Sequence, residues 1–340
     1  MKTRATSFLL AALAVVSLVL PALAAESDAP SAENVEEVEN AICLDGEPVD
    51  SVEYEIRGGV CYVTVSSFVS MLDPEAMVEE EDGVVFVNAT TVTEIIPVSM
   101  ESGEAETDEN AESEEDAESD EFPETGEAAE PVEDGEEAEE AETANVVTAD
   151  LNLEATVGEG YFWANGRYLY VDDGLIDLNG SVAVPVRQLA RVFNLTVDYD
   201  GLTGQVLLDH QEDADPYLTC GEDAYDSDTL YWLSRIIYCE SGNQPLLGKI
   251  AVGNVVMNRV NDSRFPDTIY DVLFQKNQFT PAATGSIYRD PNGESIVAAK
   301  LVMDGAWVTD ALFFNAVGAR SYASRNRTYV ATIGDHAFYK

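Results

Sequence analysis

The sequence predicts a multidomain chain of the α+β class, in which β-rich units precede a mainly helical domain. Three observations support this architecture. The 340 residues exceed the size of one ordinary domain. Short runs of β-branched residues bounded by glycine turns occur in two places, whereas long helix-periodic apolar runs occur only near the carboxy terminus. A long acidic tract separates the two β-rich units and marks the boundaries between them.

The first segment has the pattern of a secretory signal. Two basic residues precede the apolar residues 8–20, and residues 21–24 include the small side chains that suit cleavage. We therefore predict a signal peptide at 1–24 and a short acidic spacer at 25–40. The apolar run is short for a membrane span, and no later segment is long and apolar enough to cross a membrane. We expect a protein without a transmembrane anchor after cleavage, either secreted, extracellular or associated with the cell wall.

Two β-rich units follow, at 41–100 and 146–210. Each has a strand, a hairpin, a helix and a closing pair of strands, and each has glycines at matching places, such as Gly46 and Gly166. The pattern predicts two copies of one repeat. Residues 211–228 are polar and predict a linker to the last domain, which should occupy 229–340.

Charge is distributed very unevenly along the chain. Residues 101–145 contain 22 Asp or Glu and neither Lys nor Arg, so this tract repels itself and has little apolar surface to bury. We predict a disordered acidic linker there. The last domain is close to neutral, so the net charge of −48 belongs mostly to the preceding half. Such acidity argues against nucleic acid as a partner, because phosphate binding needs clustered basic residues.

Export would permit disulfides, and the four cysteines form two local pairs, Cys43 with Cys61 and Cys220 with Cys239. Local pairing is the simplest prediction, although four cysteines allow three connectivities. With only two histidines and scattered cysteines, the sequence predicts no metal site, and no cofactor is expected. A nucleophilic role for Cys239 would need a histidine partner, and a structural thiol is the favoured interpretation.

One acid stands out in the last domain. Leu233, Ile237 and Glu240 fall at i, i+4 and i+7 of an apolar run, so they share one face of a predicted helix. Burial makes a carboxylate costly to ionise, so such a group needs either a partner or a raised pKa. Arg235 or Arg259 would be the partner in the first case. In the second case the group is a proton donor, as cleavage of a glycosidic bond requires.

The last domain resembles the SleB/CwlJ family of spore-cortex and cell wall hydrolases over nearly its whole length. This resemblance implies a mainly α, lysozyme-like and lytic-transglycosylase-like fold that cleaves the glycan strands of peptidoglycan. The motifs that carry it are LSRIIYCESGNQP at 233–245, GKIAVGNVVMNRV at 248–260, FPDTIYDVLF at 265–274, QF at 278–279, ALFFN at 311–315 and RNRTYVATIGDHAFY at 325–339.

The second β-rich unit resembles the stalk module related to the N-terminal domain of copper amine oxidases. The motifs are NGR at 165–167 and VPVRQLA at 184–190. In that family two half-modules often form one unit, so the acidic tract is expected to be an insertion between halves. The name implies no copper here, since neither copy has a cluster of metal ligands.

The resemblance also implies a catalytic mechanism. Glu240 followed by Ser241 fits the catalytic acid of lytic transglycosylases, which cleave the β-1,4 bond from N-acetylmuramic acid to N-acetylglucosamine through attack by the muramic C6 hydroxyl. No second acid lies near Glu240 in the sequence, which favours this reaction over hydrolysis by a two-carboxylate muramidase. A non-catalytic wall-binding protein with the same fold is the other alternative. The predicted substrate-binding residues, each equally suited to a structural role, are Ser241, Asn258, Gln278, Phe279 and Asn315.

Overall fold

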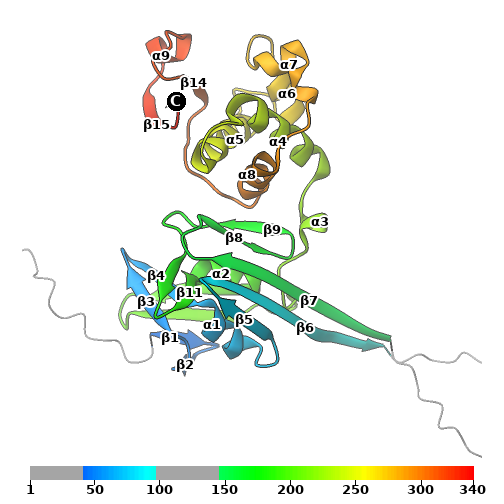
Figure 1. Ribbon diagram of the computed structural model, residues 1–340, viewed down its shortest axis with the longest axis vertical. Helices are drawn as coiled ribbons and strands as arrows, with labels where there is room; N and C mark the ends of the chain where they lie inside the picture. The colour runs from blue at the N-terminus through cyan, green and yellow to red at the C-terminus, as the bar shows by residue number, and fades with distance from the viewer. Residues whose placement is uncertain (1–40, 97–144) are drawn as a thin grey trace, which may run out of the picture. The chain divides into compact units, whose positions relative to one another are not determined.

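The structure, a computed structural model, describes residues 41–96 and 145–340 (Figure 1). Residues Asn40–Lys340 form one compact unit. The predicted signal peptide, the spacer and nearly all of the acidic tract lie outside the described residues. Among the described helices, none combines the length and the apolar character that a membrane span requires.

The two β-rich units form one domain, which we call the stalk module. Its described strands make three sheets, with the orders β12-β13-β1-β2, β10-β11-β4-β3 and β5-β6-β7-β8-β9. The strands of the first unit are β1 (Ile42–Leu44), β2 (Glu47–Val49), β3 (Tyr54–Arg57), β4 (Val60–Thr64), β5 (Met77–Glu81) and β6 (Val84–Ile96), with helix α1 (Val65–Leu72) after β4. Those of the second are β7 (Asn145–Thr156), β8 (Tyr161–Ala164), β9 (Arg167–Tyr170), β10 (Ile176–Leu178), β11 (Ser181–Pro185), β12 (Leu195–Asp200) and β13 (Gln205–His210), with helix α2 (Val186–Val192) after β11.

Each sheet of the stalk module contains strands from both units. Strand β1 pairs in parallel with β13, and β4 pairs antiparallel with β11. One hydrophobic core joins the two units, with Phe68 of α1 and Leu189 of α2 both fully buried in it. The two repeats therefore depend on each other, because each supplies strands that complete the other's sheets.

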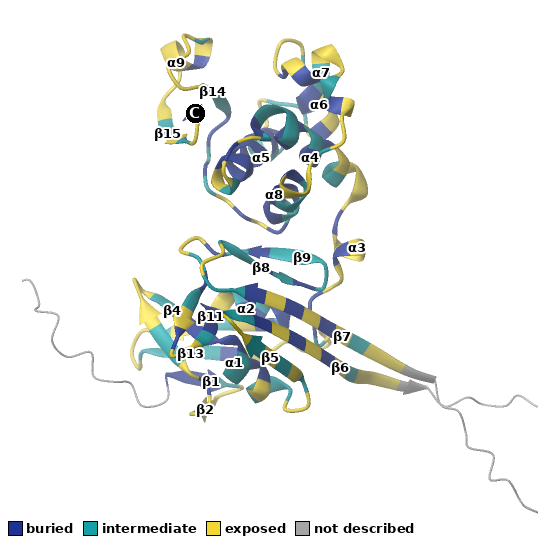
Figure 2. Ribbon diagram, in the orientation of Figure 1, coloured by how far each residue is buried: buried dark blue, intermediate teal, exposed yellow. Residues whose placement is uncertain are grey.

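The long ribbon of β6 and β7 shows where the acidic tract is inserted. The two strands pair antiparallel from Val84 opposite Thr156 to Ile96 opposite Asn145. Buried and exposed residues alternate along them, so one face of the ribbon covers the core (Figure 2). Since the tract leaves at the end of β6 and returns at the start of β7, it connects the two strands of one hairpin.

The glycines that indicated the repeat occupy equivalent tight turns. A two-residue hairpin turn of the favoured hand requires positive φ at both positions, which Asn, Asp and Gly adopt at the lowest cost. Asp45 and Gly46 have φ of 51° and 82°, and Asn165 and Gly166 have 47° and 79°. The internal repeat is therefore confirmed at the level of backbone conformation.

The last domain combines helices with a small sheet of order β14-β16-β15. The helices predicted near Leu230, Pro245, Thr268 and Glu294 are present within a few residues of those starts, whereas the small sheet and the short helices after Phe279 were not predicted. The helices are α4 (Ser227–Ser241), α5 (Leu246–Val260), α6 (Ile269–Phe274), α7 (Thr280–Thr284), the 3-10 turn η1 (Ser286–Tyr288), α8 (Gly293–Met303) and α9 (Tyr322–Asn326), and the strands are β14 (Phe313–Ala316), β15 (Tyr329–Ile333) and β16 (His336–Tyr339).

The polar segment 211–228 is not a free linker, contrary to the prediction. Tyr217 and Leu218 are buried in the core of the stalk module, and the Leu218 amide donates to the Val192 carbonyl at 2.8 Å. The short helix α3 (Gly221–Ala224) then packs on the β8–β9 turn, where a Cβ on Gly221 would lie 2.5 Å from the Gly166 carbonyl oxygen. The segment looks polar because its few apolar residues are spaced singly, yet those residues attach it.

A buried carboxylate connects the β8–β9 hairpin to the end of α8. Asp304 is 7% exposed and accepts hydrogen bonds from Arg167, including one from Nε at 2.8 Å. The Tyr225 hydroxyl and the Tyr168 amide donate to its other oxygen. Because the donors come from three different segments, Asp304 holds the hairpin, the connector and α8 together; we call this group the Asp304 cluster.

The predicted disulfides are absent, because all four cysteines are free. Cys43 lies on β1 and Cys61 on β4, which belong to different sheets. Cys220 is exposed ahead of α3, whereas the Cys239 thiol on α4 donates to the Ser286 carbonyl at 3.3 Å. Proximity in sequence suggested these pairs, but the strand and helix positions direct the thiols to other neighbours.

Candidate active site

Helix α4 carries Glu240 near its carboxy-terminal end. The helix begins at Asp226, whose side chain accepts from the Thr229 amide at 2.8 Å. Its apolar stripe packs inward, with Leu233 fully buried. It stops at Gly242, where a Cβ would lie 2.6 Å from the Tyr238 carbonyl oxygen, so a side chain at this position would force the helix end to shift.

Helix α5 is the buried centre of the domain, as its apolar sequence predicts. Its Ile250, Val252 and Val255 are fully buried, and it packs on α4 and α8. Gly253 permits this close approach, because a Cβ there would lie 2.9 Å from Val302 and 3.0 Å from Ile237. The close packing of these three helices gives the end of α4 a rigid support.

The Glu240 carboxylate is half-buried and makes no hydrogen bond or ion pair with any described residue. Burial raises the pKa of its carboxyl above the ordinary value, because desolvation disfavours the charged form. The group therefore has the environment of a proton donor rather than that of a structural carboxylate.

The two arginines that would have made Glu240 a structural ion pair are engaged elsewhere. Arg235 donates to Asp290 at 2.9 Å and lies 3.9 Å from the centre of the Tyr231 ring. Arg259 donates to the Leu312 carbonyl at 2.7 Å. The salt-bridge alternative for Glu240 is therefore wrong, since both candidate partners face other segments.

Arg259 joins three of the segments that define this domain. Its guanidinium donates to Gln278 Oε1 at 3.1 Å and lies 5.1 and 5.2 Å from the ring centres of Phe279 and Phe313. Desolvation lowers its pKa to about 10, so the group remains charged at neutral pH. Sequence reasoning considered Arg259 only as a partner of Glu240 and missed this role, because the contacts reach segments far along the chain.

The turn after Glu240 is attached to the β15–β16 hairpin. Gln244 Oε1 accepts from the Asp335 amide at 2.8 Å, and Gln244 Nε2 donates to the Asp335 carboxylate at 3.1 Å. Asp335 is therefore the acid that the fold brings to the α4–α5 turn, although 95 residues separate it from Glu240 in the sequence. A cleft of about 570 Å³ opens beside this turn and is lined by Gln244, Lys249 and Tyr161 among others.

Replacing Gln244 with alanine is expected to destabilise the chain by about 1–2 kcal/mol, because the Asp335 amide and carboxylate would lose their partner in a partly buried place. Urea unfolding of the variant measures this change. Asn326→Ala serves as the control, since the described bond of that exposed amide stays within its own helix. Equal losses in both variants would show that the Gln244 contact does not hold the turn.

The predicted substrate-binding residues differ in their surroundings. Ser241 is buried and donates to the Ile237 carbonyl at 2.8 Å, and Phe279 is 4% exposed. Asn258 donates through its side-chain amide to the Thr309 and Ala311 carbonyls, both at 3.0 Å. These three side chains are thus occupied in the fold. Gln278 is exposed and Asn315 half-buried, so both have surface available to a ligand.

The remaining reactive side chains of the domain offer no other catalytic centre. Burial raises the pKa of the Cys239 thiol, which disfavours a nucleophilic thiolate. Burial lowers the pKa of His336, whose ring packs edge-on against Phe314 at 5.3 Å between centres. Within the residues that the structure describes, no group of three His, Cys, Asp or Glu side chains could hold a metal ion.

Comparison with known proteins assigns both parts of the chain to families. Residues 243–339 match the Cell Wall Hydrolase family, and residues 136–208 match the copper amine oxidase N-terminal domain. The first match begins just after Glu240. The second covers the second β-rich unit and the end of the acidic tract.

Curated relatives agree with the first match. The chain is 36% identical over 121 residues to a spore cortex-lytic enzyme of Bacillus cereus, which covers 34% of this chain and 46% of that protein. It is 34% identical over 109 residues to the spore cortex-lytic enzyme of Bacillus subtilis, covering 31% and 35%. The chain thus spans less than half the length of these relatives.

Among solved structures, the catalytic domain of the Bacillus cereus SleB protein is 33% identical, with 34% of this chain and 92% of that chain covered and a TM-score of 0.33. The catalytic domain of SleB from Bacillus anthracis is 32% identical, covering 36% and 100%, with a TM-score of 0.32. The carboxy-terminal domain of this chain therefore belongs to the cell wall hydrolase family.

Proposed function

We propose that the chain is an exported enzyme that cleaves the glycan strands of peptidoglycan, with Glu240 as its single catalytic acid and base. The observation that carries this proposal is the half-buried Glu240 carboxylate, whose pKa is raised and which has no described partner. The family assignment supports a wall substrate, and the predicted signal peptide supports a place outside the cell, in or near the wall. A lysozyme-like arrangement of α4 and α5 would present Glu240 to the strand.

The proposed reaction is that of a lytic transglycosylase. Protonated Glu240 donates its proton to the glycosidic oxygen of the bond from N-acetylmuramic acid to N-acetylglucosamine, and the C1–O bond breaks. The muramic C6 hydroxyl attacks C1 and gives its proton to Glu240, which restores the acid. The product carries a 1,6-anhydro ring, and no water is consumed. A single partly desolvated carboxyl is sufficient for this cycle.

Gln278 and Asn315 are the predicted residues that we retain as direct sugar contacts. Gln278 is exposed and uses Oε1 to accept from Arg259, which leaves its amide nitrogen available to donate to a sugar. Asn315 accepts from the Ser321 hydroxyl and donates to the Ala316 carbonyl at 3.0 Å. Ser241, Asn258 and Phe279 would instead support the site from within the fold.

Hydrolysis with two carboxylates is the second candidate, and one observation favours it. Asp335 is attached by Gln244 to the turn that follows Glu240, which makes it the most plausible second acid in the described part of the domain. In that mechanism a carboxylate activates water or attacks the sugar, and the product has a reducing end. An Asp335→Asn variant would then lose activity to a similar extent as a Glu240 variant.

Mass analysis of the fragments released from purified wall distinguishes these mechanisms. Spore cortex and vegetative wall should both be digested, since either is a potential substrate. Anhydromuramic ends support transglycosylation, whereas reducing ends support hydrolysis. Absence of any release from both walls would contradict the enzyme and favour a non-catalytic wall-binding protein of the same fold.

The rate of release should fall as pH rises through the raised pKa of Glu240, because only the protonated carboxyl can donate to the leaving oxygen. A pH profile of kcat/KM on solubilised glycan strands tests this expectation. The descending limb should lie above the ordinary range of a glutamate. A rate that stays constant or increases through that range would contradict the role of Glu240 as the acid.

A further inference from the structure

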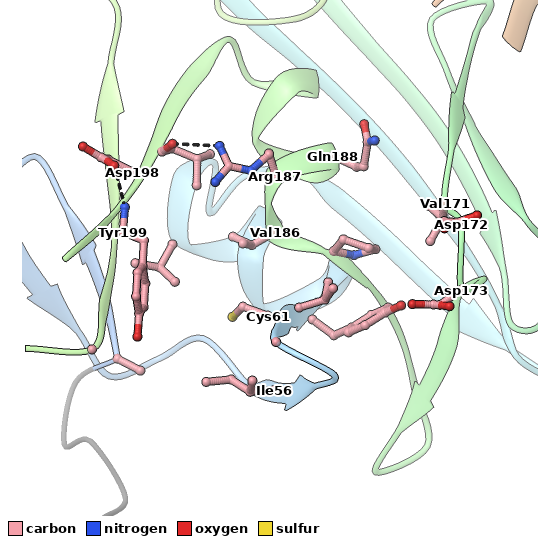
Figure 3. Close-up of a pocket in the computed structure, with 18 of the residues that line it drawn as sticks. Ile56, Cys61, Val171, Asp172, Asp173, Val186, Arg187, Gln188, Asp198 and Tyr199 are labelled. Atoms are coloured by element: carbon pink, nitrogen blue, oxygen red, sulfur yellow. Dashed lines mark hydrogen bonds between the residues drawn. The ribbon is translucent and has the colours of Figure 1, made fainter. Parts of the chain in front are cut away.

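A pocket of about 450 Å³ lies in the stalk module, between strands of both β-rich units and helix α2 (Figure 3). Its size is within the usual range for sites that bind small molecules. Neither the proposed reaction nor the cell wall hydrolase family accounts for it, since every residue that lines it belongs to the stalk module.

The floor of this pocket is apolar. Figure 3 shows Val186 and Cys61 at its centre and Ile56 beside them. Burial raises the pKa of the Cys61 thiol to about 11, so this group is a neutral, weakly polar part of the floor. Ile56 and Tyr199 are 55% and 60% exposed, so apolar surface remains open to a ligand at the rim.

The charges around the pocket are separated by sign. Asp172 and Asp173 stand on one side, and Arg187 stands on α2 above Val186 (Figure 3). Among the described residues Arg187 donates only to the Val197 carbonyl, at 3.0 Å, which leaves most of its five N–H donors available. Asp172 accepts from the Tyr170 hydroxyl at 3.0 Å, and a carboxylate has capacity for further donors.

We infer that this pocket binds a short peptide that carries an ammonium group and a carboxylate at opposite ends of an apolar stretch. The ammonium would lie against Asp172 and Asp173, the apolar stretch over Val186 and Cys61, and the carboxylate at Arg187. The peptide stems of peptidoglycan, which contain a diamino acid, have this chemistry. The choice of that source rests on the proposed function, whereas the chemistry of the ligand rests on the pocket.

The balance of charge argues against other wall components. The lining contains three acids, Asp172, Asp173 and Asp198, against one base, Arg187, so an anionic polymer would be repelled. An uncharged glycan would leave the carboxylates and the guanidinium without charged partners. A ligand with both charges pairs each sign, and charge-assisted hydrogen bonds are about twice as strong as neutral ones.

Isothermal titration of the chain without residues 1–24 tests the inference, with the tripeptide L-Ala-γ-D-Glu-L-Lys as the probe. We expect saturable binding that weakens at least about tenfold in Arg187→Gln and in the double variant Asp172→Asn/Asp173→Asn. All three side chains are exposed, so these variants should fold. Asp209→Asn is the matched control, because this exposed acid lies outside the pocket and its change should leave binding unaltered.

Changes to the probe assign each end of the ligand. Norleucine in place of lysine removes the ammonium, and a carboxy-terminal amide removes the carboxylate; each should weaken binding at least about tenfold. Equal binding of the norleucine probe, or no saturable binding of the tripeptide, overturns the inference. Competition by a peptide-free chitin oligosaccharide also overturns it, because the site would then recognise glycan.

Two further outcomes separate this inference from neighbouring explanations. Binding that appears only after residues 25–40 are removed would identify that segment as the occupant and would overturn the inference. Cleavage of wall without tripeptide binding overturns the inference and leaves the proposed function standing. Tripeptide binding by a chain that cleaves no wall supports the inference and contradicts the proposed function.

Discussion

Replacing Glu240 with glutamine is expected to lower the release of wall fragments by about 10²–10⁴-fold, because the amide cannot donate or accept the proton of the reaction. The same variant should be more stable than the wild type at neutral pH. Between the ordinary pKa of a glutamate and the raised value in the fold, the folded state binds more protons, so stability falls as pH rises through that window. Glutamine stays neutral and escapes this loss.

Release of fragments and urea unfolding at acidic and neutral pH measure both effects in one protein. Glu222→Gln is the control, since this exposed acid of α3 undergoes the same chemical change away from the site. A Glu240→Gln variant with wild-type release would contradict the catalytic assignment. A variant that loses stability at neutral pH would show that the carboxylate is a structural group with an unrecognised partner.

Replacing Asp304 with alanine is expected to destabilise the chain by about 3–5 kcal/mol, because it leaves a guanidinium and a tyrosine hydroxyl without their buried acceptor. The Asp304 side chain is 1% exposed and that of Arg167 is 17% exposed, so water replaces the lost contacts poorly. The measurement is the free energy of unfolding in urea. The effect should reach both parts of the compact unit, since the Asp304 cluster joins α8 to the β8–β9 hairpin.

The control for this prediction is Asp310→Ala, which breaks the exposed pair with Lys340 and should cost at most about 1 kcal/mol. The double variant Arg167→Ala/Asp304→Ala should lose less stability than the sum of the two single variants, because each change already removes the partner of the other. Additive losses, or a loss at Asp304 no larger than that at Asp310, would show that the cluster does not hold these segments together.

Several features of the fold followed from local physics. The apolar periodicity of α4 and α5 predicted both helices within a few residues, and Asp226 and Gly242 mark the ends of α4 as capping rules require. The paired glycines predicted a repeat, and the positive φ values at Gly46 and Gly166 explain why. These features depend on neighbours in the chain, so the sequence alone displays them.

Other features depended on contacts between distant segments. The small sheet of β14, β15 and β16 escaped notice because its strands are short and lie among polar residues. The predicted disulfides failed because β1 and β4 join different sheets. The connector at 211–228 was mistaken for a free linker, since the surfaces that bury Tyr217 and Leu218 belong to the stalk module.

The candidate site divides in the same way. The sequence by itself identified Glu240, because a carboxylate on an apolar helix stripe is costly and therefore conspicuous. It also determined the secretory pattern, the two repeats and the acidic insertion. Only the tertiary structure decided that Arg235 and Arg259 face away from Glu240, that Asp335 meets the turn beside it, and that the two repeats form one core. Periodicity reports which face a residue occupies, whereas partners are chosen by packing between segments far apart in the chain.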